Sequence, residues 1–210
     1  MTNAYDEIYL DDATETLGSA TEYAVLVADL SGEQFIDLFN TSGIAAEFGR
    51  GNVKYISGMS GIELCRLVMH KCGLTLPEVT EIEHIDYPAE YWCGWILAYY
   101  QWYSGRSFAS ITKKLTFESL MDMYHVLHEA DPSKACTVFD EIMAKPSETN
   151  LAIHRKNLGL SQNALAEASD VSVRSIQLYE QRKTDISKAQ HNHLQNLARV
   201  LGCEIKDLLE

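Results

Sequence analysis

Residues 158–183, LGLSQNALAEASDVSVRSIQLYEQRK, constrain the fold more than any other segment of this 210-residue chain. Ser161 and Ser172 are good N-cap residues, and each precedes a short stretch whose apolar residues have helical spacing. Ser169–Val171 separates the two stretches, and its central Asp170 is one of the few non-glycine types that tolerates the left-handed conformation of a tight interhelical turn. The segment therefore predicts two short helices joined by a sharp turn.

The second of these helices has two different faces. Ile176 and Tyr179 are three residues apart and are expected to pack inward, whereas Val173, Arg174 and Gln177 point largely to the other side. The outward residues are short, polar or cationic, which suits contacts with base edges and phosphates.

The segment resembles the Cro/C1-type (XRE) helix-turn-helix family. The resemblance covers about residues 149–210 and rests on Leu160-Ser161-Gln162, Leu165-Ala166-Glu167, Val171-Ser172, Ser175-Ile176 and Tyr179-Glu180. Upstream, a first helix is expected with Leu151 and Leu158 on its apolar side. Downstream, Ser187 is expected to open a helix that contains Leu194, Leu197, Ala198 and Leu201 and stops at Gly202, before a short fifth helix in CEIKDLLE.

The resemblance implies a role for individual residues. Arg155 and Glu180 match a salt bridge between the first and third helices, and Gln162 matches a residue that contacts phosphate and braces the recognition helix. The positions expected to face the major groove are Ser172, Val173, Arg174 and Gln177. The positions expected to touch the DNA backbone are Gln181, Arg182, Lys183 and Lys188. Members of the family usually bind inverted repeats as dimers.

Three residues depart from the family pattern, and roles other than DNA contact stay open for several residues of the second helix. Asp170 and Arg182 replace common glycines, and Leu178 stands where a polar, base-reading residue is frequent. Val173 and Leu178 could be partly buried, and Arg174 could be a solvated charge. Some helix-turn-helix folds never bind DNA. One hypothesis is therefore that the chain is a protein-interaction module that does not bind DNA.

The charge of the chain is unevenly distributed. The 17 Lys and Arg residues against 30 Asp and Glu give a net charge of −13, but residues 149–210 hold eight basic and seven acidic residues. The preceding part therefore carries −14 and should repel DNA, bind something basic, or keep the protein soluble. The stop signal Lys145-Pro146-Ser147-Glu148 predicts two domains, an acidic partner- or effector-binding domain over 1–145 and a DNA-binding domain over 149–210.

The first domain is expected to be helical almost throughout, which makes the whole chain all-α. A helix over residues 8–30 is expected to weaken or break near Gly18. Ser31, Ser60 with Glu63, Thr116 and Asp131 are expected helix caps, Ser42 is expected to start a short turn, and the last two helices should end near Ala130 and Lys145. Residues 74–88 lack helical periodicity, and 80–85 are expected to form a brief extended piece.

An aromatic helix over residues 89–104 is the most distinctive segment of this domain. Its rings cover more than one face: Tyr91, Trp92, Trp95, Tyr99, Tyr100, Trp102 and Tyr103. It is either a central helix buried all round or a helix that keeps some rings at a partner interface, with Arg106 nearby.

Other classes of protein fit the sequence poorly. No run of about 18 apolar residues appears, and the acidic amino terminus is unlike a signal peptide, so we expect a cytoplasmic protein without membrane contact. The five scattered cysteines indicate reduced thiols, and HxxHE at His125–Glu129 is not the HExxH order of zinc hydrolases. We expect no enzyme activity, no metal and no cofactor.

The sequence thus predicts a DNA-binding transcriptional regulator, most simply a repressor that acts as a homodimer. One hypothesis makes it an autoregulating antitoxin whose acidic domain binds a toxin, since the whole chain, with its motif SGIAAEF and its segment YYQWYSGRSF, looks similar to regulators of toxin-antitoxin-like operons. A second hypothesis makes it a small-molecule sensor whose aromatic helix lines a pocket.

Overall fold

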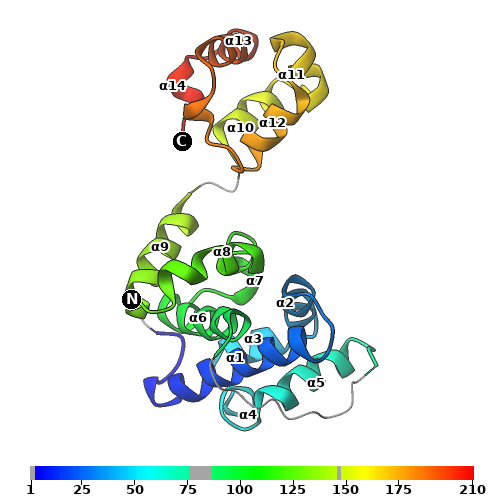
Figure 1. Ribbon diagram of the computed structural model, residues 1–210, viewed down its shortest axis with the longest axis vertical. Coiled ribbons are helices and arrows are strands. Elements are labelled where there is room, and N and C mark those ends of the chain that lie inside the picture. Colours follow the sequence, from blue (N-terminus) through cyan, green and yellow to red (C-terminus); the bar gives the residue numbers. More distant parts are fainter. Residues whose placement is uncertain (1–2, 76–86, 146–147) are drawn as a thin grey trace. The chain divides into compact units, whose positions relative to one another are not determined.

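The computed structural model describes residues 3–75, 87–145 and 148–210, and every regular element in them is a helix (Figure 1). The extended piece expected at 80–85 lies outside the described residues. The chain divides into two compact units, Met1–Lys145 and Pro146–Glu210. Within the described segments, no helix is both long and apolar enough to cross a membrane.

The N-terminal unit begins with a 3-10 turn and continues with nine α-helices in its described part. The elements are η1 Glu7–Tyr9, α1 Leu10–Leu26, α2 Gly32–Thr41, α3 Ile44–Gly49, α4 Val53–Ile56, α5 Gly61–Lys71, α6 Ala89–Ser104, α7 Phe108–Ile111, α8 Phe117–Leu127 and α9 Pro132–Ala144. Its core includes four phenylalanines from α2, α3 and α7, with edge-to-face rings 5.2 Å apart at Phe39 and Phe108. The long helices α1 and α6 pack side by side at the centre (Figure 1).

Glycines let α1 and α6 approach closely. A Cβ on Gly94 of α6 would lie 2.3 Å from the Thr21 Oγ1 atom and 2.4 Å from the Leu17 carbonyl oxygen, both on α1. A Cβ on Gly18 of α1 would lie 2.8 Å from the ring of Tyr91 on α6. The expectation that Gly18 interrupts the first helix is wrong, because α1 runs through it and the missing side chain makes room for that ring.

The predicted caps of the N-terminal unit are confirmed. Ser31 and Ser60 each form a capping box, with Gln34 and Glu63 respectively, and Thr116 and Asp131 each accept a hydrogen bond from the first turn of their helix. Some boundaries differ from the prediction. The first α-helix ends at Leu26, α3 begins after Gly43 rather than at Ser42, α8 ends at Leu127, and the short helices α4 and α7 were not predicted.

The aromatic helix α6 is buried on most of its surface. Tyr91, Trp92, Tyr100 and Trp102 are buried, and the remaining three rings are half-buried. The polar tips of two buried rings have partners: the Tyr100 hydroxyl donates to Asp140 at 2.7 Å, and the Trp102 indole donates to the Tyr5 carbonyl at 2.9 Å. The helix is therefore mainly a core element, as one of the two interpretations predicts.

The C-terminal unit consists of short helices around one small core. Its elements are α10 Asn150–Asn157, α11 Gln162–Ser169, α12 Val173–Glu180, the 3-10 turn η2 Ile186–Lys188, α13 His191–Leu201 and α14 Ile205–Leu208. The apolar core residues are Leu151, Leu165, Ala166, Val171, Ile176, Tyr179, Ile186, Leu194, Leu197, Ala198, Leu201 and Leu208. Helices of eight residues are marginal alone, so this shared core holds them.

Candidate nucleic-acid interface

The turn between α11 and α12 has the predicted construction. The Ser161 hydroxyl accepts a hydrogen bond from the Ala164 amide at 3.0 Å, and the Ser172 hydroxyl accepts one from the Ser175 amide at 3.0 Å. Between the two caps, Asp170 is left-handed, with φ 55° and ψ 31°. These local bonds fix where each helix begins, and the turn fixes where α12 points.

A buried ion pair joins α10 to the end of α12. Arg155 Nε lies 2.6 Å from Glu180 Oε1, and a second guanidinium nitrogen lies 2.9 Å from Oε2, so the pair is bidentate. The two side chains are only 10% and 8% exposed. Burial by itself raises the pKa of Glu180, but the hydrogen bonds from Arg155 and Gln162 outweigh it and hold that pKa below its ordinary value. The salt bridge implied by the family resemblance is present.

Gln162 extends this pair into a network. Its amide nitrogen donates to Glu180 Oε2 at 2.8 Å, so α11 and α10 both hold the same carboxylate at the end of α12. Arg155 also donates to the Leu160 carbonyl at 2.7 Å. The bracing role of Gln162 therefore has a direct structural basis, which the sequence indicated only through the family resemblance.

The exposed face of α12 begins at its N-terminus. Ser172 and Arg174 are exposed, and Val173 and Gln177 are half-buried. Gln177 and Gln181 are four residues apart and share one face with Arg174. Val173 lies at the edge of this face and also packs against the core of the unit, so it is partly buried, as one of the alternatives predicts. Leu178 is half-buried, which agrees with the apolar character that sets it apart from the family pattern.

Basic residues follow α12, and one of them, Arg182, forms an ion pair within the C-terminal unit. Lys183 and Lys188 are exposed. Arg182 has φ 55°, a left-handed conformation that accounts for the glycine expected at this position. Its guanidinium lies 2.5 Å from a Glu210 carboxylate oxygen and donates to the Glu148 carbonyl at 3.2 Å. No local sequence pattern indicates this contact, because 28 residues separate Arg182 from Glu210.

Two expectations about the flanking helices are wrong. Leu158 is 52% exposed because α10 ends at Asn157, and the inward positions of that helix belong to Leu151, Ala152 and Arg155. Ser187 does not open a long helix. It lies in the 3-10 turn η2, where the Asp185 side chain accepts a hydrogen bond from its amide, and α13 begins only at His191.

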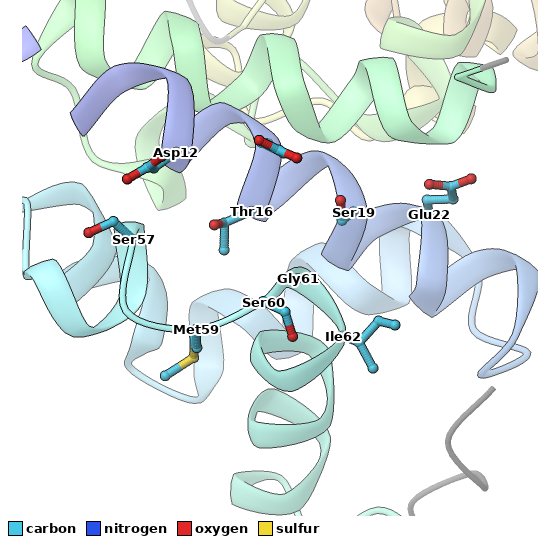
Figure 2. A pocket seen from close by; sticks show the side chains of 10 residues that line it. Asp12, Thr16, Ser19, Glu22, Ser57, Met59, Ser60, Gly61 and Ile62 are labelled. Atoms are coloured by element: carbon cyan, nitrogen blue, oxygen red, sulfur yellow. The ribbon is translucent and has the colours of Figure 1, made fainter. Parts of the chain in front are cut away.

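The N-terminal unit also contains an acidic pocket of about 330 Å³ between α1 and the loop before α5. Its carboxylates do not converge. Asp12 and Glu22 lie at opposite ends of the pocket, with Thr16 and Ser19 between them (Figure 2). Among the residues that the structure describes, no group of three His, Cys, Asp or Glu side chains could hold a metal ion.

Comparison with known families matches the C-terminal unit. A helix-turn-helix family model matches residues 151–208, which include α11 and α12 and end at the last residue of α14. Neither the curated proteins nor the solved structures gave a match to the chain. The domain with the exposed α12 face is thus of the kind that DNA-binding transcription regulators carry.

Proposed function

We propose that this chain, whose residues 151–208 form a Cro/C1-type helix-turn-helix domain, is a sequence-specific DNA-binding transcriptional repressor. The observation that carries the proposal is the combination of an exposed polar face on α12 with a buried network at its end. Ser172 and Arg174 are exposed at one end, while Glu180 is anchored at the other by Arg155 and Gln162. A recognition helix must combine these properties, because base contacts need a fixed orientation.

The proposed complex places α12 in the major groove. Arg174 would pair with guanine, Val173 would contact a thymine methyl, and Ser172 and Gln177 would meet neighbouring base edges. Phosphates would be bound by the exposed residues Gln181, Lys183 and Lys188. Gln162 and Arg182 would also contact phosphate, while their bonds to Glu180 and Glu210 hold them in position. We further propose that a homodimer binds an inverted repeat whose half-sites lie about one helical turn apart.

We further propose that the chain represses its own operon, and this can be tested with DNA from upstream of its gene. In a gel-shift assay, the full chain is expected to retard a fragment of the DNA upstream of its own gene, and an unrelated fragment of equal length serves as the control. Added salt should weaken the shift steeply, because phosphate contacts release counterions. If the chain fails to retard the upstream fragment at low salt, autoregulation is wrong.

For the N-terminal unit we propose an antitoxin role, in which this unit binds and neutralises a toxin. It rests on charge, since residues 1–148 hold 23 acidic residues and nine basic ones and suit a basic partner. If a small toxin-like reading frame lies beside this gene, its product is expected to stop growth when expressed alone and to be neutralised and co-purified when this chain is expressed with it. A product that is harmless alone, or that stays toxic in the presence of the chain, would contradict the proposal.

Control of DNA binding by a small molecule is the alternative function that a structural observation favours. The aromatic helix borders a groove of about 340 Å³, which falls in the size range of ligand pockets. In this alternative the same DNA-binding domain acts, but a metabolite rather than a toxin sets its output.

A further inference from the structure

Aromatic rings from two helices line the groove beside α6. Tyr87, Tyr91, Trp92 and Trp95 lie before or within the first half of α6, and Tyr124 and His128 lie at the end of α8. We call these six residues the aromatic groove. Its volume is about 340 Å³, and the remaining lining is mostly aliphatic, from residues such as Ile96 and Leu127.

The rings of the aromatic groove fix one another in position. Tyr87 stacks on Tyr91 with ring centroids 4.2 Å apart, and Tyr124 stacks on His128 at 4.4 Å. Trp92 meets Tyr124 edge to face at 5.7 Å and so connects α6 to α8. Tyr91 and Trp92 are only 8% and 9% exposed, which leaves them little freedom to turn. The wall of the groove is therefore largely formed before any ligand binds.

The charges around the aromatic groove are negative. Among the residues that the structure describes, no lysine or arginine lines it. A Glu129 carboxylate oxygen lies 3.7 Å from the ring of His128. Burial raises the pKa of Tyr91 most, followed by the neighbouring Tyr87, and the acidic residues Glu15 and Glu22 of α1 act in the same direction. A cation is favoured in such a place and an anion is repelled.

We propose that the aromatic groove binds a small organic cation, an ammonium group that carries an aromatic or alkyl body. The faces of tryptophan and tyrosine rings attract cations, most strongly when water is excluded, and the apolar lining accommodates the rest of the molecule. The net charge of −14 on residues 1–148 adds to the attraction over a longer range. This inference goes beyond DNA binding and does not depend on it.

A matched pair of probes tests the charge directly. Isothermal titration calorimetry of the full chain uses (3-hydroxyphenyl)trimethylammonium as the cation and 3-tert-butylphenol as its uncharged isostere. The cation is expected to bind about tenfold more tightly than the isostere, because the two have nearly the same shape and the attraction of the charge to the rings exceeds the cost of desolvating it. Benzenesulfonate, an aromatic anion, is expected not to bind.

Variants on one helix place the binding site. Trp95→Leu should weaken binding of the cation about tenfold or more, and Trp95→Phe should restore much of it, because a ring face is kept. Tyr103→Leu is the matched control, since Tyr103 is also a half-buried aromatic residue of α6 but does not line the groove. Circular dichroism of each variant checks that the helices are intact.

Several results would overturn the proposal. Equal affinity for the cation and the isostere would make the groove simply apolar, and no binding of the cation at millimolar concentration would remove the site. Equal losses for Trp95→Leu and Tyr103→Leu would place binding elsewhere. If sedimentation shows a dimer that Trp95→Leu dissociates, a second copy of the chain occupies the groove instead. A failed gel shift leaves all of these readouts unaffected, so the two proposals fail separately.

Discussion

Glu180→Ala is expected to lower the free energy of unfolding of the C-terminal unit by about 3–5 kcal/mol, because it removes one partner from a buried ion pair. The Arg155 side chain is 10% exposed in the intact pair, so its charge would be left in a poorly solvated site. Gln162 would lose its acceptor on Glu180 at the same time. The small core of this unit has little excess stability to absorb such a loss.

The free energy of unfolding of the C-terminal unit should be measured separately from that of the N-terminal unit. Native-state hydrogen exchange at the backbone amides of α11–α13 gives the opening free energy of that region. Tryptophan fluorescence is the internal reference, because all three tryptophans lie in residues 1–145 and should show an unchanged transition. Lys206→Ala is the matched control. It breaks an exposed pair with Glu204, in which the side chains are 73% and 72% exposed, and should cost less than about 1 kcal/mol.

The pH dependence follows from the lowered pKa of Glu180. Because the folded-state pKa lies below the ordinary value, the contribution is fully present above the ordinary carboxyl pKa and is lost as the pH falls through the folded-state pKa. Glu180→Gln should therefore be destabilised near neutral pH and should lose less further stability on acidification than the unaltered chain.

The comparison of the two alanine variants can contradict the proposed role of the ion pair. If Glu180→Ala and Lys206→Ala have equally small effects, the network does not hold α12 in place.

The parts of the fold that could be predicted from the sequence are those set by neighbours along the chain. Ser31, Ser60, Ser161 and Ser172 were recognisable as caps because each hydroxyl bonds an amide three residues later. The left-handed turn at Asp170 was predictable from the residue type, because aspartate is one of the few non-glycine residues that tolerate this conformation. The all-helical class and the helix-turn-helix domain follow from such local signals repeated at regular spacing.

The features that the sequence did not reveal depend on distant residues. Gly18 is a poor helix former, yet α1 continues through it because the Tyr91 ring from α6 occupies the space beside it. Arg182 meets Glu210 across 28 positions, and no periodicity announces such a contact. Leu158 has helical spacing from Leu151 but follows the end of α10, and an error of one residue at a boundary was enough to misplace it.

Arg174→Ala is expected to cost about 1–3 kcal/mol of discrimination, a loss of roughly 5- to 150-fold in preference for the selected DNA over a variant with the contacted guanine replaced. Arg174 is exposed near the N-terminus of α12, where a recognition helix contacts bases, and a bidentate contact with guanine would be lost with its guanidinium. The measurement compares the affinities of the full chain for DNA selected from a random library and for single-base variants of that DNA, at one stated salt concentration.

Lys183→Ala is the contrasting variant that gives this comparison its meaning. Lys183 is exposed beyond the end of α12 and is proposed to contact phosphate, so its loss should weaken binding to every sequence about equally and reduce the salt dependence by about one counterion. If Arg174→Ala weakens all sequences equally too, Arg174 is a phosphate contact. The sequence preference would then have to come from Ser172, Val173 and Gln177 or from the shape of the DNA, because these are the remaining routes to specificity on this face.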